Sequence, residues 1–195
     1  MLNLILILPL FAATSLSPSD DLLHIHYLVD EQGREVVLHG LNVSGAAKTD
    51  PLGMAWHRRA DYARMSDWGF NAVRLLLFWN VLEAEEGRYN RAYLNRLRLR
   101  LDWAHENDLK VILDMHQDLY GPKFGGDGAP EWATHDGGIP FESTSPWWLN
   151  YVHPAVSTAF SNMWNEVWLQ QKYQRAWQMI ARRLGDHPAV IGYDL

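Results

Sequence analysis

Two kinds of hydrophobic pattern alternate along this chain of 195 residues. Nearly continuous apolar runs at 72–78 and 111–115 are typical of strands that are buried on both faces of a parallel sheet. Between these runs, Leu94, Leu97 and Leu101 recur at helical spacing. A further strand is expected to begin at Val190. The alternation predicts parallel strand–helix–strand units with right-handed crossovers.

Residues that favour helix caps set the expected ends of the helices. A helix that contains Tyr62 and Met65 is expected to end at Gly69, since glycine readily adopts the left-handed conformation that closes a helix. Asn90 is expected to cap the next helix. The apolar face that follows the long glycine- and proline-rich segment predicts one continuous helix over about 155–184.

The first part of the chain predicts a short β-hairpin. Two β-rich segments, 22–29 and 35–43, flank a turn at 30–33. Farther along, residues 117–154 are expected to form a long loop, because they are rich in glycine and proline.

Two architectures fit this order of elements, namely an open doubly wound sheet and a (β/α) barrel. No glycine-rich phosphate loop follows the first strand, which disfavours nucleotide binding. A complete barrel needs eight strands and typically ~250 residues. Only about four barrel strands are expected here. On the barrel interpretation, the chain is therefore an α/β protein that forms the amino-terminal half of a (β/α)8 TIM barrel, preceded by the short β-hairpin.

Composition narrows the possible functions. The net charge of −6 provides no basic surface for nucleic acid, and the absence of cysteine excludes disulfides and zinc–thiolate sites. The ten tryptophans and eight tyrosines fit either core packing or flat platforms for the C–H faces of sugars.

The amino terminus predicts export. Residues 1–13 are almost wholly apolar and small residues follow, so 1–17 is predicted to be a secretory signal peptide and 18–195 the partial barrel domain of a secreted protein. The alternative is an amino-terminal segment that packs into the core. The run is too short to span a bilayer, which needs ~20 residues, and no later stretch is a candidate for an integral membrane span.

Candidate chemistry follows the strand at 111–115. Asp114, His116 and Asp118 are two residues apart, so an extended backbone places them on one face. Barrel enzymes carry their chemistry at the carboxyl ends of such strands. The alternatives are local structural hydrogen bonds, or a metal site built from these three residues. No second histidine motif with usable spacing supports the metal alternative.

Five strings then carry a resemblance: LHGLNVSGAAK, WGFNAVRLLLFWNVLEAEEGRYN, VILDMHQDLYG, GAPEWATHDGG and HPAVIGYDL. Their order and spacing resemble family 5 glycoside hydrolases, in particular the endoglycoceramidase-like subgroup, from about Val36 to Leu195. The resemblance implies a (β/α)8 barrel and retaining hydrolysis of β-glycosidic bonds by two glutamates. In the subgroup the acid/base glutamate belongs to an Asn-Glu pair just after a string like that of 192–195, and the nucleophile belongs to a later strand. Because the reaction needs both carboxyl groups, the chain by itself is expected to be inactive.

The resemblance also assigns roles to supporting residues. Arg74 matches an arginine that donates to the nucleophile carboxylate and lowers its pKa, and His116 matches a histidine near the catalytic centre or the sugar hydroxyls. Without the resemblance, Arg74 fits a structural ion pair, and His116 fits a core histidine.

Substrate-binding positions are implied in the same way. Asp114 and Asp118 match positions that bind glycan hydroxyls, Lys48 resembles a lysine that donates to the glycan, and Trp164 resembles an aromatic that lines the sugar subsite. The alternatives are a surface lysine at position 48 and core packing at position 164, with Trp168 as the other candidate for the sugar-binding ring.

Several side chains stay outside these assignments. Trp79 and Asn80 are expected to face the cleft, whereas Glu83, Glu85 and Glu86 are expected to be solvated. No cofactor, metal or obligate protein partner is inferred, and the expected partner is an oligosaccharide or glycolipid substrate. The alternative function is a non-catalytic carbohydrate-binding or pseudo-enzyme module.

Overall fold

The computed structural model describes residues 27–54 and 56–195, which divide into two units at His39 and Gly40. In the first unit, residues 30–33 form a tight turn and Val29 pairs with Glu35 in an antiparallel bridge. Gly33 has a φ of 74°, in the left-handed region that such turns require. The turn and its pairing agree with the predicted hairpin, whereas segment 22–26 of its first strand and the predicted signal peptide lie outside the described residues.

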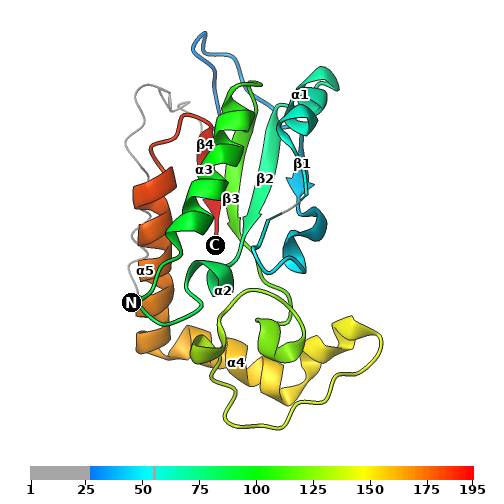
Figure 1. Ribbon diagram of the computed structural model, residues 1–195, viewed down its shortest axis with the longest axis vertical. Coiled ribbons are helices and arrows are strands. Elements are labelled where there is room, and N and C mark those ends of the chain that lie inside the picture. Colours follow the sequence, from blue (N-terminus) through cyan, green and yellow to red (C-terminus); the bar gives the residue numbers. More distant parts are fainter. Residues whose placement is uncertain (1–26, 55) are drawn as a thin grey trace, which may run out of the picture. The chain divides into compact units, whose positions relative to one another are not determined.

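The second unit is built on a four-stranded parallel sheet with the order β1-β2-β3-β4 (Figure 1). Its strands are β1 (Gly40–Val43), β2 (Ala72–Leu77), β3 (Lys110–Met115) and β4 (Val190–Asp194). The predicted strand at 35–43 is therefore a strand only in its last four residues, which pair with β2. All four strands run in the same direction, so their carboxyl ends meet at one edge, as expected for half of a (β/α)8 barrel.

One helix directly precedes each of β2, β3 and β4 in the sequence, namely α1 (Arg59–Asp67), α3 (Arg91–His105) and α5 (Val167–Leu184). Figure 1 shows α3 between α1 and α5, and α3 contacts both of them as well as β3. The predicted stripe on α3 is buried, which accounts for the placement of this helix against the sheet. The predicted ends are confirmed: Asn90 Oδ1 accepts from Tyr93 N at 3.0 Å, and Gly69 follows α1 with a φ of 84°.

The predicted helix over 155–184 is instead two helices, α4 (Pro154–Asn165) and α5, which run in different directions (Figure 1). Glu166 separates them with an extended backbone, φ −92° and ψ 110°. Its side chain accepts from His135 Nδ1 at 2.7 Å, an interaction with the preceding loop that periodicity along the helix does not reveal. Each helix then buries an apolar stripe of its own.

The connections at the carboxyl edge are mostly irregular, as predicted for 117–154. Their short helical elements are α2 (Trp79–Leu82), η1 (Gly45–Lys48), η2 (Pro122–Phe124), η3 (Glu131–Ala133) and η4 (Trp147–Val152). Among the residues described, no helix is both long and apolar enough to cross a bilayer.

Two expectations about the segment after β2 are wrong. Trp79 is buried in the core rather than facing a cleft, and Glu83 is buried rather than solvated. Glu83 Oε2 accepts from Trp79 Nε1 at 2.9 Å and its Oε1 accepts from Gly87 N at 2.8 Å, so the carboxylate keeps its hydrogen bonds when it leaves water. Its carbonyl accepts from Trp132 Nε1 at 2.9 Å, which ties this segment to the long loop. Glu85 and Glu86 are exposed, as expected.

Candidate active site

A continuous series of polar contacts runs along the carboxyl edge of the sheet, from the segment after β1 to the end of β4. We call it the rim network. Its members are Lys48, Arg74, Asp114, His116, Asp118 and Asp194.

Arg74 links three strands within this network. It stands in β2, and its Nη2 lies 3.0 Å from Asp114 Oδ1 of β3, while its Nε donates to Asp194 Oδ2 of β4 at 2.8 Å. The strand register explains this reach, because Asp114 pairs with Leu76 on one side and with Asp194 on the other. The planar guanidinium thus holds two carboxylates at once in a fixed geometry.

His116 joins Asp114 to Asp118. Its Nδ1 donates to Asp114 Oδ2 at 2.8 Å, since a carboxylate only accepts, and this leaves Nε2 as the ring nitrogen without a proton in the neutral form. Nε2 lies 3.8 Å from Asp118 Oδ2 and is buried without a hydrogen-bond partner among the described residues. The predicted convergence of Asp114, His116 and Asp118 is confirmed, and the accepting capacity of Nε2 is unused among the described residues.

Asp118 is held from two sides. Lys48 Nζ, in η1, lies 2.5 Å from its Oδ2, and Tyr151 in η4 donates its hydroxyl to Oδ1 at 3.1 Å. Burial raises the pKa of Tyr151, so the phenol keeps the proton that it donates. Lys48 therefore lies beside Asp118, and the resemblance assigns both residues to glycan binding. Tyr151 is a further neighbour of Asp118 that the sequence did not indicate.

Asp127 is a second residue that sequence reasoning missed. Its backbone forms an antiparallel bridge with Asp118, in which both N–H groups donate, at 3.0 and 3.1 Å. The side chain is 6% exposed and its Oδ1 has no hydrogen-bond partner in the described part of the chain. Burial, followed by the charge of Asp118, raises the pKa of Asp127 to about 6, against the opposing charges of His116 and Lys48.

Glycine makes this bridge possible. A Cβ at Gly126 would lie 1.8 Å from the carbonyl oxygen of Asp118, and one at Gly128, where φ is 122°, would lie 2.5 Å from the Cβ of Gln117. Asn80 N donates to the carbonyl of Gly128 at 2.7 Å, which places Asn80 next to the same loop. The sequence signal that could have revealed Asp127 is its position among glycines. Glycines permit an unusual path of the backbone, but they leave no periodic pattern from which the path can be predicted.

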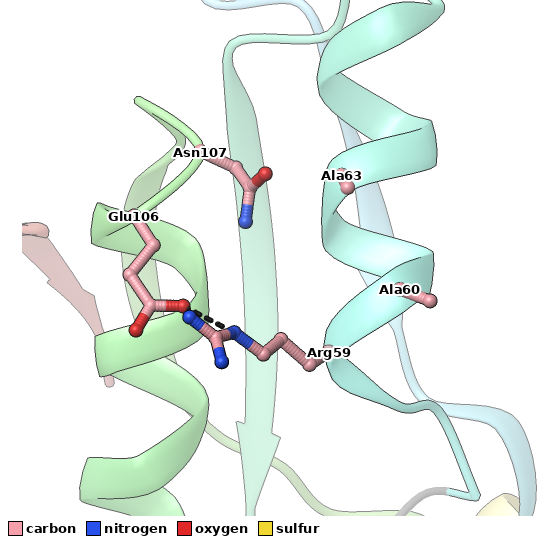
Figure 2. Close-up of a pocket in the computed structure, with 5 residues that line it drawn as sticks. All are labelled: Arg59, Ala60, Ala63, Glu106 and Asn107. Carbon is pink, nitrogen blue, oxygen red and sulfur yellow. Dashed lines mark hydrogen bonds and ion pairs between the residues drawn. The ribbon is translucent and has the colours of Figure 1, made fainter.

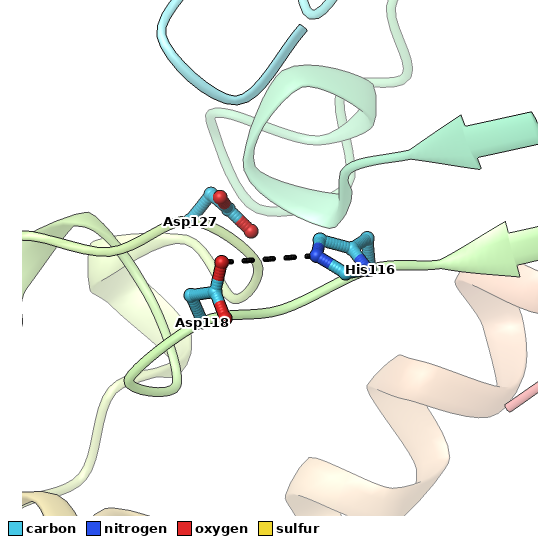
Figure 3. Close-up of side chains that lie close together, drawn as sticks. All are labelled: His116, Asp118 and Asp127. Atoms are coloured by element: carbon cyan, nitrogen blue, oxygen red, sulfur yellow. Dashed lines mark ion pairs between the residues drawn. The ribbon is translucent and has the colours of Figure 1, made fainter. Parts of the chain in front are cut away.

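Three side chains of this region offer ligand atoms within 4.8 Å of one another, namely His116, Asp118 and Asp127 (Figure 3). In this set Asp127 takes the place of Asp114, which belonged to the metal site considered from the sequence. Asp114 is already engaged by Arg74 and His116. Nitrogen and carboxylate oxygen are suitable donors for a divalent ion. However, the ammonium group of Lys48 already neutralises Asp118, and it would repel a cation at short range. The arrangement is better suited to accepting hydrogen bonds from sugar hydroxyls.

Among the described residues, no hydrogen bond or ring contact joins Trp164 to the rim network. It lies on α4, and its side chain is 70% exposed. Trp168, the other candidate, stacks on His135 with ring centroids 5.4 Å apart. The predicted sugar-binding role of Trp164 stays a prediction.

An open hollow of about 420 Å³ lies away from these residues, between α1 and the end of α3 (Figure 2). It contains one ion pair, in which Arg59 Nε lies 2.6 Å from Glu106 Oε2. The other lining residues, Ala60, Ala63 and Asn107, bring no titratable group, so the hollow lacks the chemistry of the rim network.

Comparisons with known proteins agree with the fold. Residues 29–195 match the family model described as Cellulase (glycosyl hydrolase family 5). Endoglycoceramidase I of Rhodococcus hoagii (strain 103S) is 33% identical over an alignment of 175 residues, which covers 87% of this chain and 35% of that protein.

Two solved structures of Endo-glycoceramidase II from Rhodococcus sp. each superpose with a TM-score of 0.80. The ganglioside GM3 complex is 38% identical and covers 91% of this chain and 42% of that one. The lactosyl-enzyme intermediate is 40% identical and covers 86% of this chain and 41% of that one. The chain thus spans well under half the length of these relatives.

Proposed function

Because the chain belongs to the cellulase family, glycosyl hydrolase family 5, we propose that it forms one wall of the active site of a retaining β-glycosidase that cleaves the sugar from a glycolipid. The observation that carries the proposal is the rim network. It gathers acceptors and donors from β2, β3 and β4 and from the segments that follow β1 and β3, toward the edge where barrel enzymes perform their chemistry.

The residues divide into two roles under this proposal. Lys48, Asp118 and the free Nε2 of His116 form hydrogen bonds with sugar hydroxyls and fix the orientation of the ring. Arg74 is a positioning residue, because its guanidinium holds Asp114 and Asp194 in a fixed arrangement.

Hydrolysis with retention of the anomeric configuration requires two catalytic carboxyl groups in addition to these residues. In a retaining glycosidase one carboxyl group protonates the leaving oxygen, while another, ~5–5.5 Å away, attacks the anomeric carbon. The lactosyl-enzyme intermediate of the Rhodococcus relative supports such a covalent route. The family resemblance assigns both catalytic groups to glutamates that follow strand β4 in sequence, so we expect the 195-residue chain alone to hydrolyse no glycoside.

Glycolipid is the proposed substrate class because the Rhodococcus relatives are named endoglycoceramidases, and one was solved with ganglioside GM3. The test is hydrolysis of a ganglioside in detergent and of a soluble aryl β-lactoside by the full gene product that contains this sequence. Release of intact oligosaccharide is expected from the first substrate. Sugar binding without any hydrolysis would replace the enzyme with the carbohydrate-binding alternative.

Variants assign the roles. Asp118→Asn should raise KM roughly 10- to 100-fold, since it weakens charge-assisted hydrogen bonds, whereas Arg74→Lys should act mainly on kcat. Arg59→Met, which changes an arginine outside the network, is the matched control and should change neither constant. Equal effects of all three variants would contradict the proposed site.

The cellular location is part of the proposal. The apolar run before residue 17 supports cleavage of a signal peptide and secretion of the remainder. Intact mass measurement of the protein recovered from the medium of an expressing cell tests this. Retention of residues 1–17 would contradict it.

A further inference from the structure

The short helix η4 presents two different faces. Its inward residue Tyr151 donates to Asp118 in the rim network. Four other residues of the same turn are large, apolar and exposed, at 52%, 57%, 48% and 78% respectively: Trp147, Trp148, Leu149 and Val152. We call these four residues the apolar turn (yellow in Figure 1).

The apolar turn is held in place by its interior. Asn150 is buried, its Nδ2 donates to the carbonyl of Trp147 at 2.8 Å, and its Oδ1 accepts from Thr144 N at 2.8 Å. These bonds fix the backbone while the apolar side chains point away from it. The exposure of the four side chains is therefore part of an ordered element, and such clustered exposure on a folded protein marks an interaction surface.

The stretch of sequence that contains the apolar turn, residues 143–165, carries no Asp, Glu, Lys or Arg, in a chain of which 21% is charged. The charged side chain that hydrogen-bonds to η4 is Asp118, which lies on the inward side with Tyr151. A protein partner that binds through ion pairs finds nothing to pair with in this stretch. A lipid surface fits better, because tryptophan and aliphatic side chains partition into the region between head groups and acyl chains without needing a complementary shape.

We propose that the apolar turn inserts shallowly into a lipid surface and so brings the rim network to the sugar of a glycolipid embedded in it. The proposal rests on the proposed function. The connection between the two sites is direct, since Tyr151 and the apolar side chains belong to one six-residue element. The absence of charge further predicts binding to zwitterionic lipid that is insensitive to salt.

The test measures co-sedimentation of the full gene product with phosphatidylcholine vesicles that contain no glycolipid. Leu149→Ser/Val152→Ser should weaken partitioning roughly tenfold or more, because each side chain loses its apolar contact with the lipid. Trp148→Ser should act in the same direction. Leu99→Ser, which changes an exposed apolar residue on α3, is the matched control and should leave partitioning unchanged.

Hydrolysis of the soluble aryl β-lactoside separates this inference from the proposed function. If the wild-type protein cleaves it and both apolar-turn variants retain that activity, loss of vesicle binding by the variants supports the inference. Unchanged vesicle binding in active variants overturns the inference and leaves the proposed function standing. Absence of cleavage by the wild type overturns the proposed function instead.

Two further outcomes identify another occupant. A raised KM for the soluble lactoside in Trp148→Ser, without loss of vesicle binding, would make the apolar turn a sugar platform. Dissociation of a dimer by Leu149→Ser/Val152→Ser in sedimentation velocity would make it a contact with a second copy. Either result overturns docking to lipid.

Discussion

Arg59 and Arg74 each hold a carboxylate, yet the two ion pairs have different physical meanings. Arg59 lies 2.6 Å from Glu106, with 68% and 42% of the two side chains exposed, whereas Arg74 lies 3.0 Å from Asp114, with 32% and 4% exposed. The shorter pair is the weaker one, because water and salt screen it and two long side chains lose freedom. The longer pair neutralises a carboxylate that has left water, so its loss leaves a buried charge uncompensated.

The same contrast separates the two regions around them. The hollow beside Arg59 is large and open, but it has one ion pair and no other titratable group. The rim network instead concentrates charged and hydrogen-bonding groups from three strands and from the segments that follow β1 and β3. Chemistry, rather than the size of a depression, identifies the candidate site here.

The largest effect should come from Arg74→Met. Removing the guanidinium leaves Asp114 buried with His116 as its remaining partner, so the free energy of unfolding should fall by about 3 kcal/mol. Urea denaturation of the full gene product measures this. Arg74→Met/Asp114→Leu should recover part of the loss, because it removes the stranded charge. A loss of unfolding free energy below about 0.5 kcal/mol in Arg74→Met would contradict the proposed difference between the Arg74 and Arg59 ion pairs.

Asp127→Asn should have a smaller effect that depends on pH. The folded pKa of about 6 lies above the unfolded value, so the folded state binds more protons and the wild type loses stability as pH rises through this window. Relative to the wild type, the variant should gain roughly 1–2 kcal/mol between pH 4 and pH 7.5. Urea denaturation at both pH values checks this, and a gain that does not change with pH would contradict it.

Asp136→Asn should show the opposite dependence and serves as the matched comparison. Burial alone would raise the pKa of Asp136, but hydrogen bonds from Lys123 and Gly138 and the charge of Lys123 outweigh it, so the pKa is lowered. Stability from this group is present above the unfolded pKa and disappears as pH falls through the folded pKa. The variant should therefore cost roughly 1 kcal/mol at pH 7. Denaturation at pH 3 should show a smaller difference.

The smallest effect is expected for Arg59→Met. Because both members of the pair are exposed, the free energy of unfolding should change by less than about 0.5 kcal/mol, and added salt should reduce the difference further. A loss that approaches that of Arg74→Met would show that the distance between the charges, rather than their removal from water, determines the strength of these pairs.

Sequence patterns predicted what depends on regular periodicity. The buried runs of β2 and β3, the apolar stripe of α3 and the cap at Asn90 all follow from spacing along one element. The meeting of Asp114, His116 and Asp118 was predictable for the same reason, since alternation along a strand fixes which side chains share a face.

The failures arose where a contact between distant segments decides the outcome. Glu83 is tied to the long loop by the bond from Trp132 to its carbonyl, and the helix break at Glu166 coincides with a bond from His135. Asp127 was missed because a glycine-rich loop, rather than a periodic element, carries it to Asp118.

Two residues that have no side chain govern the acidity of Asp127. Any larger residue at Gly126 or Gly128 would force the loop away from Asp118 and Gln117, and Asp127 would move with it. The number of acids would stay the same, but their mutual repulsion and shelter from water would change. A change in how the stability of such a protein depends on pH can thus originate at positions that contact no sugar, because the path of the backbone alone sets the environment of the acid.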